Sequence, residues 1–172
     1  MTAQRVDLAD LGEVFDAYSR PLLRYATQRV GPNLAEDVVA ETFLIAHERR
    51  QSYDPAKGEP LPWLYGIATN VLRKHLRVEK RALRAIAGQV EAENLDQRAA
   101  DRIDAERSMR RAASILAGLP RRQRDVLLLF AVAELEYAEI AAALGIPLGS
   151  VQSALHRART KVRAAIVSGG SR

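Results

Sequence analysis

The chain has 172 residues, carries a net charge of +5 and contains no cysteine, and 48% of its residues are hydrophobic. This length suits one ordinary domain or two small ones. The apolar content can build a buried core, which excludes a largely disordered chain. The lack of cysteine excludes disulfides and thiolate zinc sites and fits a reducing compartment. Glycine and proline are few, at 10 and 7 residues, which favours helices.

The N-terminus, "MTAQRVDLADLGEVF", lacks the basic-then-apolar layout of a signal peptide. The longest apolar run, "VLLLFAVA" at 126–133, is far shorter than the roughly 20 residues of a membrane span. We therefore expect a cytoplasmic protein with no membrane insertion.

Charge alternates in blocks along the chain. Residues 73–84, "RKHLRVEKRALR", carry six basic residues against one acid, whereas 91–106 carry six acids against two bases. A net positive charge alone is weak evidence for nucleic-acid binding. Its concentration in blocks is more informative.

Apolar residues recur at three- and four-residue steps through 7–30, which predicts a first helix with one apolar face: Leu11, Phe15, Tyr18, Leu22 and Tyr25. The "GPN" at 31–33 ends it. Asn33 is expected to cap a second helix over roughly 34–50, with Glu36 completing a capping box.

The second helix has two predicted faces. Its core face consists of Val38, Val39, Thr42, Phe43 and Ala46. The opposite stripe, at positions i, i+4, i+7 and i+11, consists of Asp37, Glu41, Leu44 and Glu48. A solvated acidic face would explain the carboxylates alone, but Leu44 among them favours a surface that binds a partner.

The segment 51–62, "QSYDPAKGEPLP", is predicted to be a loop, with Pro62 as the first residue of a third helix. The buried face of this helix is predicted to consist of Leu64, Ile67, Ala68 and Val71. A second stripe places an aromatic ring and an amide in line with cations, which is more specific than cations alone: Trp63, Asn70, Lys74, Arg77 and Arg81.

The sequence therefore predicts an all-α fold with two small helical domains. The first covers 5–84 and the second 107–168. An acidic linker, 85–106, joins them.

Residues 136–163, "EYAEIAAALGIPLGSVQSALHRARTKVR", have the spacing of a helix-turn-helix. Gly145 comes where the first helix must end with a positive φ, and Ala141 leaves room for the second helix to cross closely. Ser150 is expected to cap the second helix. The buried faces are predicted to be Ile140, Ala141 and Leu144, then Val151, Leu155, Ala158 and Val162.

The outward side chains of the second helix suit DNA: Gln152, Ser153, His156, Arg157, Arg159 and Arg163. The early ones can reach base edges and the later ones phosphates, because a recognition helix enters the major groove by its N-terminal part. A solvated basic helix in a packing pair is the alternative.

Three segments occur in the order and spacing found in bacterial extracytoplasmic-function (ECF) sigma factors: "AEDVVAETFLIAHER", "PLPWLYGIATNVLRKHLR" and "LPRRQRDVLLLFAVAELEYAEIAAALGIPLGSVQSALHRAR". The chain resembles this family over nearly its whole length apart from the linker. The resemblance implies a non-enzymatic subunit that binds core RNA polymerase, recognises promoter DNA, supports its melting and starts transcription. It implies no cofactor and a monomer when free, and members of the family commonly have an anti-sigma factor.

The resemblance also implies roles for individual residues. The first domain would dock on the clamp of the largest polymerase subunits through Asp37, Glu41, Leu44 and Glu48. It would engage the minus-ten element through Trp63, Asn70, Arg73, Lys74 and Arg77, with Ser52–Lys57 as a pocket for a flipped base. The second domain would read the minus-thirty-five element through Ser150, Gln152, Ser153, His156, Arg157 and Arg159. The linker would follow a basic channel on the polymerase or serve only as a spacer.

The sequence departs from the family pattern at a few positions. Gln152 and Ala154 stand where a lysine and an arginine are common, so two DNA contacts are expected to be lost, each lowering the salt slope of binding by roughly one unit. Glu136 replaces the usual serine cap, and Ala40 a common glutamine. The first departure leaves the identity of the DNA contacts open.

Three other classes of function fit the sequence less well. An enzyme is disfavoured because "HERRQ" lacks the second histidine of a helical zinc motif and no phosphate loop or nucleophile elbow is present, so no catalytic or metal residue is predicted. An ordinary repressor would leave the stripes on the second and third helices unexplained. A sigma-like decoy is favoured by Gln152 and Ala154 but disfavoured by the basic stripe over 70–81.

Overall fold

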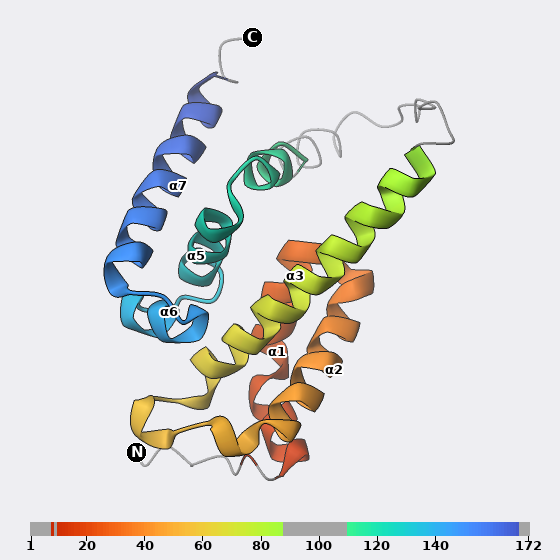
Figure 1. The fold of residues 1–172 in the computed structure, drawn as a ribbon, viewed down its shortest axis with the longest axis vertical. Coiled ribbons are helices and arrows are strands. Elements are labelled where there is room, and N and C mark those ends of the chain that lie inside the picture. The colour runs from red at the N-terminus through yellow and green to blue at the C-terminus, as the bar shows by residue number, and fades with distance from the viewer. Residues whose placement is uncertain (1–7, 9, 88–109, 169–172) are drawn as a thin grey trace.

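The computed structural model describes residues 8, 10–87 and 110–168 (Figure 1). Its named elements are α1 (Leu11–Val30), α2 (Pro32–Glu48), η1 (Arg50–Ser52), η2 (Pro55–Lys57), α3 (Pro60–Ala87), α5 (Arg121–Ala131), α6 (Tyr137–Leu144) and α7 (Leu148–Ser168). Residues 110–117 are also helical, and the described residues contain no strand. The predicted all-α class with two helical domains is confirmed. Most of the predicted linker, from residue 88 onward, lies outside the described residues.

Helices α1, α2 and α3 pack side by side into a first module (Figure 1). Leu22, Tyr25, Val38, Leu64 and Leu72 are all 0% exposed in its core. Fully burying an aliphatic side chain of this size contributes roughly 1.5–3 kcal/mol. The predicted core faces of α2 and α3 are buried throughout. The predicted apolar face of α1 is wrong at Phe15, whose side chain is 46% exposed although its ring centroid lies 5.1 Å from that of Phe43.

The starts of the first three helices differ from the predicted ones. Asp10 caps α1, since its Oδ1 accepts hydrogen bonds from the N–H groups of Gly12 and Glu13 at 2.9 and 3.1 Å. Pro32 and Pro60, not Asn33 and Pro62, mark the starts of α2 and α3. Proline suits a first helical turn because its fixed φ is already helical and the N–H it lacks has no partner there. Asn33 therefore lies inside α2 and caps nothing.

Helices α5, α6 and α7 form a second module that contains the predicted helix-turn-helix (Figure 1). Gly145 ends α6 with φ +62° and ψ 40°, which is the left-handed conformation predicted from the sequence. The turn is closed by a hydrogen bond of 3.0 Å that the Ile146 N–H donates to the Ala141 carbonyl. Ser150 does not cap α7 as predicted, because the helix already begins at Leu148 and the Ser150 N–H bonds to the Pro147 carbonyl at 2.9 Å.

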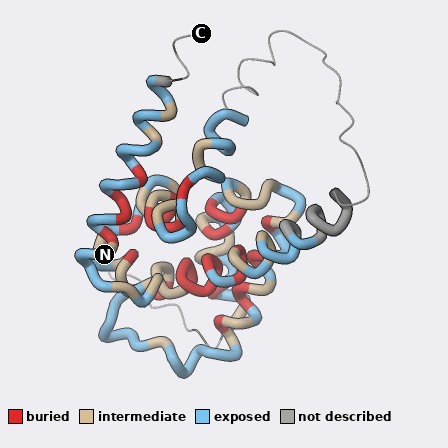
Figure 2. Tube along the Cα trace, turned by 45° about the horizontal axis from the view of Figure 1, so that its top comes forward, coloured by how far each residue is buried: buried red, intermediate tan, exposed pale blue. Residues whose placement is uncertain are grey.

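The buried positions of the two modules meet in one continuous core (Figure 2). Helix α6 packs against α3, and at Gly66 the two backbones come so close that a Cβ atom would lie 2.4 Å from the Ala143 carbonyl oxygen. Glycine is therefore required at this crossing for the two modules to approach as they do.

Within the described residues, no single helix is long and apolar enough to cross a membrane. Only α6 and α7 taken together, with a 106° bend between them, reach the necessary length and composition.

We predict that Gly145→Ala lowers the free energy of unfolding by about 1–2 kcal/mol, because a side chain in the left-handed region meets the following carbonyl. Gly145→Asn is the matched control and should cost less, since asparagine tolerates this conformation. Urea unfolding followed by circular dichroism checks both variants. Equal losses for the two would contradict a conformational origin.

Candidate nucleic-acid interface

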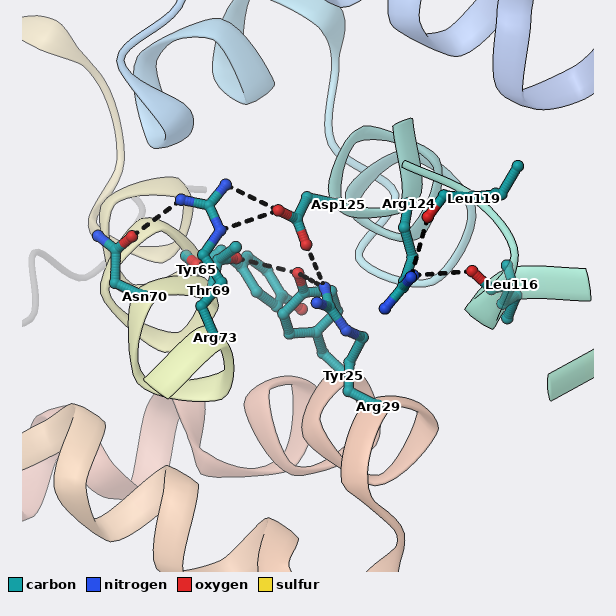
Figure 3. Close-up of polar contacts among 10 residues, drawn as sticks. All are labelled: Tyr25, Arg29, Tyr65, Thr69, Asn70, Arg73, Leu116, Leu119, Arg124 and Asp125. Atoms are coloured by element: carbon teal, nitrogen blue, oxygen red, sulfur yellow. Dashed lines mark hydrogen bonds and ion pairs between the residues drawn. The ribbon is translucent and has the colours of Figure 1, made fainter. Parts of the chain in front are cut away.

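A buried ion cluster joins the two modules (Figure 3). The carboxylate of Asp125, on α5, is 0% exposed. Its Oδ1 lies 2.7 Å from Nη1 of Arg29, on α1, and its Oδ2 lies 2.7 Å from Nη2 of Arg73, on α3. Arg73 donates a second hydrogen bond from Nε at 2.9 Å. One anion of the second module is thus neutralised by two cations of the first.

Hydrogen bonds extend this polar centre on both sides. The Tyr25 and Thr69 hydroxyls are 2.9 Å apart, and Thr69 donates to the Tyr65 carbonyl. Burial raises the pKa of the Tyr25 phenol, and it raises the pKa of the neighbouring Tyr65 to about 12. On the other side, Arg124 donates to the carbonyls of Leu116, Ala117 and Leu119 at 2.7–2.9 Å and so closes the C-terminal end of the helix at 110–117 (Figure 3).

The stripe predicted on α2 lies on the outer surface of the first module. Asp37, Leu44 and Glu48 are exposed, and Leu44 retains 59% of its accessible surface. An apolar side chain that is this exposed between carboxylates gains no stabilising interaction from the surrounding water. The α2 stripe therefore has the chemistry of a contact surface with an apolar centre and an acidic rim.

Glu41, in the middle of this stripe, is bound within the first module. Its Oε1 accepts from Nζ of Lys74 and its Oε2 lies 2.8 Å from Nε2 of His75, both on α3. The hydrogen bond from Lys74, and then that from His75, lowers the pKa of the Glu41 carboxyl. A residue predicted to bind polymerase and one predicted to bind DNA are thus paired with each other.

The stripe predicted on α3 divides into three environments. Trp63 is half-buried, with its ring 5.4 Å from that of Tyr53 in the loop. Asn70 accepts a hydrogen bond from Nη1 of Arg73 at 3.1 Å, while Arg73 itself faces Asp125. Arg77 is exposed. Arg81 is exposed as well, and so are Asn70 and Lys74 despite their hydrogen bonds.

A cavity of about 400 Å³ opens beside Trp63. The loop between α2 and α3 forms one wall and α3 another, and the first helix of the helix-turn-helix, α6, forms the third. The loop is held in shape, because the Tyr53 hydroxyl donates to the Gly58 carbonyl at 2.7 Å and Asp54 accepts from the Ala56 N–H at 3.0 Å. The cavity lining includes Ser52, Tyr53, Lys57, Trp63, Asn70 and Glu139.

The side chains predicted on the recognition helix share one exposed face of α7: Gln152, Ser153, His156, Arg157 and Arg159. Ser150, in the first turn, is half-buried. The guanidinium of Arg159 stacks over the Phe130 ring at 4.7 Å, which fixes its direction. In Figure 1, α7 lies on the outer side of the second module, with α5 between it and α3.

Ala154 does not lie on the face of α7 that was predicted to contact DNA. It is 6% exposed and lies on the face of α7 that packs into the core. The expectation that this position had lost a contact is wrong for this fold, because a long side chain there would first have to displace core packing. Gln152 is exposed, and the same expectation stays a prediction for it.

Sequence reasoning missed three residues that join the modules: Arg29, Gly66 and Asp125. Asp125 stands three and four positions before the buried Leu128 and Leu129, so periodicity alone places it on the core face of its helix. An acid on a core face requires a buried partner of opposite charge. Nothing in the sequence indicates which arginine supplies it.

The described residues contain no group of three or more metal-ligating side chains that could hold an ion. The surfaces described above are one acidic face with an exposed leucine, one basic face and a cavity with an aromatic wall.

The chain matches two family models, one over each module. Residues 14–82 match sigma-70 region 2, and residues 109–162 match sigma-70 region 4. The ECF RNA polymerase sigma factor SigD of Mycobacterium tuberculosis is 32% identical over 168 residues, which cover 93% of this chain and 78% of that protein. EcfG of Rhodopseudomonas palustris is 31% identical over 80% of this chain and 74% of its own length.

Two solved structures share the fold. CnrH, in complex with the cytosolic domain of CnrY, superposes with a TM-score of 0.67 at 24% identity and covers 92% of this chain and 88% of its own. The sigma factor RpoE of Bartonella quintana, in complex with the anti-sigma factor NepR, superposes with a TM-score of 0.66 at 22% identity and covers 91% of this chain and 96% of its own.

Two helical modules, matched to regions 2 and 4 in that order, define a sigma factor of the sigma-70 type. The chain belongs to the ECF RNA polymerase sigma factors. Its partners are accordingly RNA polymerase and promoter DNA, and it acts in transcription initiation.

We predict that Glu41→Gln removes part of the acid sensitivity of the fold. A carboxyl whose pKa is lowered on folding contributes stability above its ordinary pKa of about 4.3 and loses it as the pH falls through the lowered value. The wild type should therefore lose more stability than the variant between pH 7 and pH 3 in urea unfolding. Glu48→Gln, an exposed position on the same helix, is the control and should behave like the wild type.

Proposed function

We propose that the first module docks on the clamp of core RNA polymerase and traps melted minus-ten DNA, while the second module reads the minus-thirty-five element. The observation that carries this proposal is that one chain has a helix-turn-helix with a basic face and, on the other module, both an acidic-apolar stripe and the aromatic wall of a cavity. An ordinary repressor needs only the first of these. We place the action in the cytoplasm, where RNA polymerase works.

The α2 stripe supports the docking step. Asp37 and Glu48 border the exposed Leu44, which resembles an interface with an apolar centre and a charged rim. The rim charges steer association, and the buried apolar contact slows dissociation. Glu41 belongs to the same stripe, and each of its two carboxylate oxygens already binds one residue of α3, Lys74 or His75.

The cavity beside Trp63 supports the melting step. Unstacking a base costs a few kcal/mol, and stacking on an aromatic ring returns about 1–3 kcal/mol per base. Tyr53 and Trp63 supply such rings, while Ser52 and Asn70 supply hydrogen-bonding groups for a base edge. Lys74 and Arg77 continue along α3 and suit the phosphates of the same strand.

The exposed face of α7 supports the reading of duplex DNA. Gln152 and Ser153 lie near its N-terminus, where a recognition helix meets base edges, and Arg157 and Arg159 lie where the backbone passes. The carbonyl of Gly149 already accepts from the Ser153 hydroxyl at 2.8 Å, so this hydroxyl has only acceptor capacity left for a base donor. We propose that an anti-sigma factor is a further partner, since RpoE, whose fold is similar to that of this chain, forms a complex with the anti-sigma factor NepR.

We predict that Asp37→Arg with Leu44→Ala weakens binding to core RNA polymerase at least tenfold, measured by fluorescence anisotropy, and abolishes promoter-dependent runoff transcription. The control is Asp16→Arg with Val78→Ala, which changes charge equally and removes an apolar side chain with the same 59% exposure. Equal binding by the two double variants would overturn the docking proposal. Polymerase binding by the wild type without any promoter-dependent transcript would favour a decoy.

We predict that Arg157→Ala weakens DNA binding to a similar degree on all sequences and lowers the salt slope of log K by about one unit, as the loss of one phosphate contact should. Gln152→Ala should instead relax the preference for particular bases and leave the slope unchanged. Titrations of specific and scrambled duplexes over a range of salt concentrations measure both effects. A base-dependent loss for Arg157→Ala would contradict the assigned role.

A further inference from the structure

The half-buried Phe130, near the C-terminal end of α5, packs against both helices of the helix-turn-helix. Its ring centroid lies 5.8 Å from that of Tyr137, the first residue of α6, and the two ring planes are 56° apart. On α7, the guanidinium carbon of Arg159 lies 4.7 Å from the same Phe130 centroid. Aromatic rings with centroids about 4.5–7 Å apart attract each other. Tyr137 therefore helps to hold the ring on which the Arg159 guanidinium stacks.

This stacking uses the face of the Arg159 guanidinium and leaves its edge available. The N–H donors of an arginine lie in the guanidinium plane, whereas a stacked ring covers only the face of that plane. In the part of the chain that the structure describes, Arg159 makes no hydrogen bond and no ion pair. Arg29 and Arg73, by contrast, donate to Asp125. Arg159 is thus held in place while its donors remain available to an external anion.

Helical geometry places Arg159 at one edge of the exposed face of α7. Residues two apart in an α-helix differ in direction by about 200°, so Arg157 and Arg159 lie at opposite edges of that face. Gln152, seven residues before Arg159, shares its edge. A helix in the major groove has one DNA backbone along each side. Arg159 therefore faces one of these backbones and Arg157 the other.

We propose that Phe130 positions Arg159 for a DNA phosphate, so that an uncharged aromatic residue outside the recognition helix sets part of its affinity for DNA. The inference rests on the proposed function, since it concerns how α7 binds a duplex. A mobile arginine loses much side-chain entropy when a partner fixes it. A guanidinium that is already stacked in the free protein avoids part of this loss on binding.

The proposal requires an aromatic ring at position 130, and not only an apolar side chain. Leucine fills apolar space but lacks the negative ring face that attracts a cation. Phe130→Leu should therefore release Arg159, while α5 retains a good helix former at this position. Phe130→Tyr retains the ring and is the conservative variant that should behave like the wild type.

A second control separates positioning from a general loss of stability. Leu127 is half-buried on the same helix and lines a separate apolar cavity with Leu116 and Val162. Leu127→Ala removes apolar contacts and should lower the free energy of unfolding, but it retains the stack of Arg159 on Phe130. Its affinity for DNA should equal that of the wild type. Circular dichroism and urea unfolding first define a temperature at which all variants are folded.

Two measurements on the full chain test the proposal. The first uses no DNA, because NMR relaxation of the Arg159 Nε–H bond in the free, nitrogen-15-labelled protein gives its order parameter. We expect an ordered bond in the wild type and in Phe130→Tyr, and a mobile bond in Phe130→Leu. The second is the dissociation constant for a duplex of about 30 base pairs with arbitrary sequence, since phosphate contacts carry no sequence information. Fluorescence anisotropy measures it over a range of salt concentrations.

We expect Phe130→Leu to weaken DNA binding about three- to fivefold, because the apparent dissociation constant is the intrinsic one divided by the fraction of molecules with Arg159 in place. Arg159→Ala should weaken binding further and lower the salt slope of log K by about one unit. In the Arg159→Ala background, Phe130→Leu should have no additional effect, because the interaction through which it acts is already absent.

Three results overturn the proposal. The first is an equal loss on Phe130→Leu with and without Arg159, since the ring would then act by another route. The second is an Arg159 bond that is equally ordered in Phe130→Leu and the wild type. The third is DNA binding that Arg159→Ala leaves unchanged.

These results are distinguishable from a failure of the proposed function. If the wild type binds no duplex and supports no runoff transcription, both proposals fail together. If the wild type binds DNA and Phe130→Leu binds it equally well, only the positioning role of Phe130 is overturned, and the reading of DNA by α7 stands.

Discussion

The position of the second module depends on one carboxylate. Asp125 has no solvent exposure, and a buried carboxylate is tolerated only if opposite charge and hydrogen bonds replace its hydration. Both arginines that do so belong to the other module, so the aspartate is satisfied only when the modules are in contact. The apolar contacts of α6 on α3 set the distance between the two modules. The ion cluster sets their relative orientation, since a carboxylate held between two guanidinium groups can adopt few orientations.

This arrangement gives single residues two roles. Arg73 and Glu41 lie on stripes with the chemistry of external contact surfaces, yet each is bound internally, to Asp125 and to Lys74 with His75. An external partner that takes over one of these bonded positions must first replace an internal hydrogen bond of nearly ideal length. The net affinity for that partner is therefore a difference between two similar interactions and not a full contact energy. Exposed residues such as Leu44, Arg77 and Arg157 involve no such exchange.

Local patterns predicted most of the two modules correctly, because each helix buries a face whose period is visible in the chain. The buried sides of α2 and α3 and the left-handed turn at Gly145 follow from spacing alone. The errors at Asn33, Pro62 and Ser150 are boundary errors, because each of the three helices begins a few residues earlier than predicted. The contact between modules could not be predicted, since it pairs Arg73 with a residue 52 positions away and depends on a glycine that looks unremarkable in a helical pattern.

The loop beside the cavity has a thermodynamic consequence for whatever enters there. Its shape is already fixed by the Tyr53 hydroxyl on the Gly58 carbonyl and by Asp54 at the start of η2. A ligand that enters the cavity therefore meets preformed walls, and its binding costs no free energy for ordering the loop. The calorimetric signature of entry should then resemble an apolar ligand filling a ready-made pocket, with favourable enthalpy at room temperature and a small negative heat-capacity change, and not coupled folding.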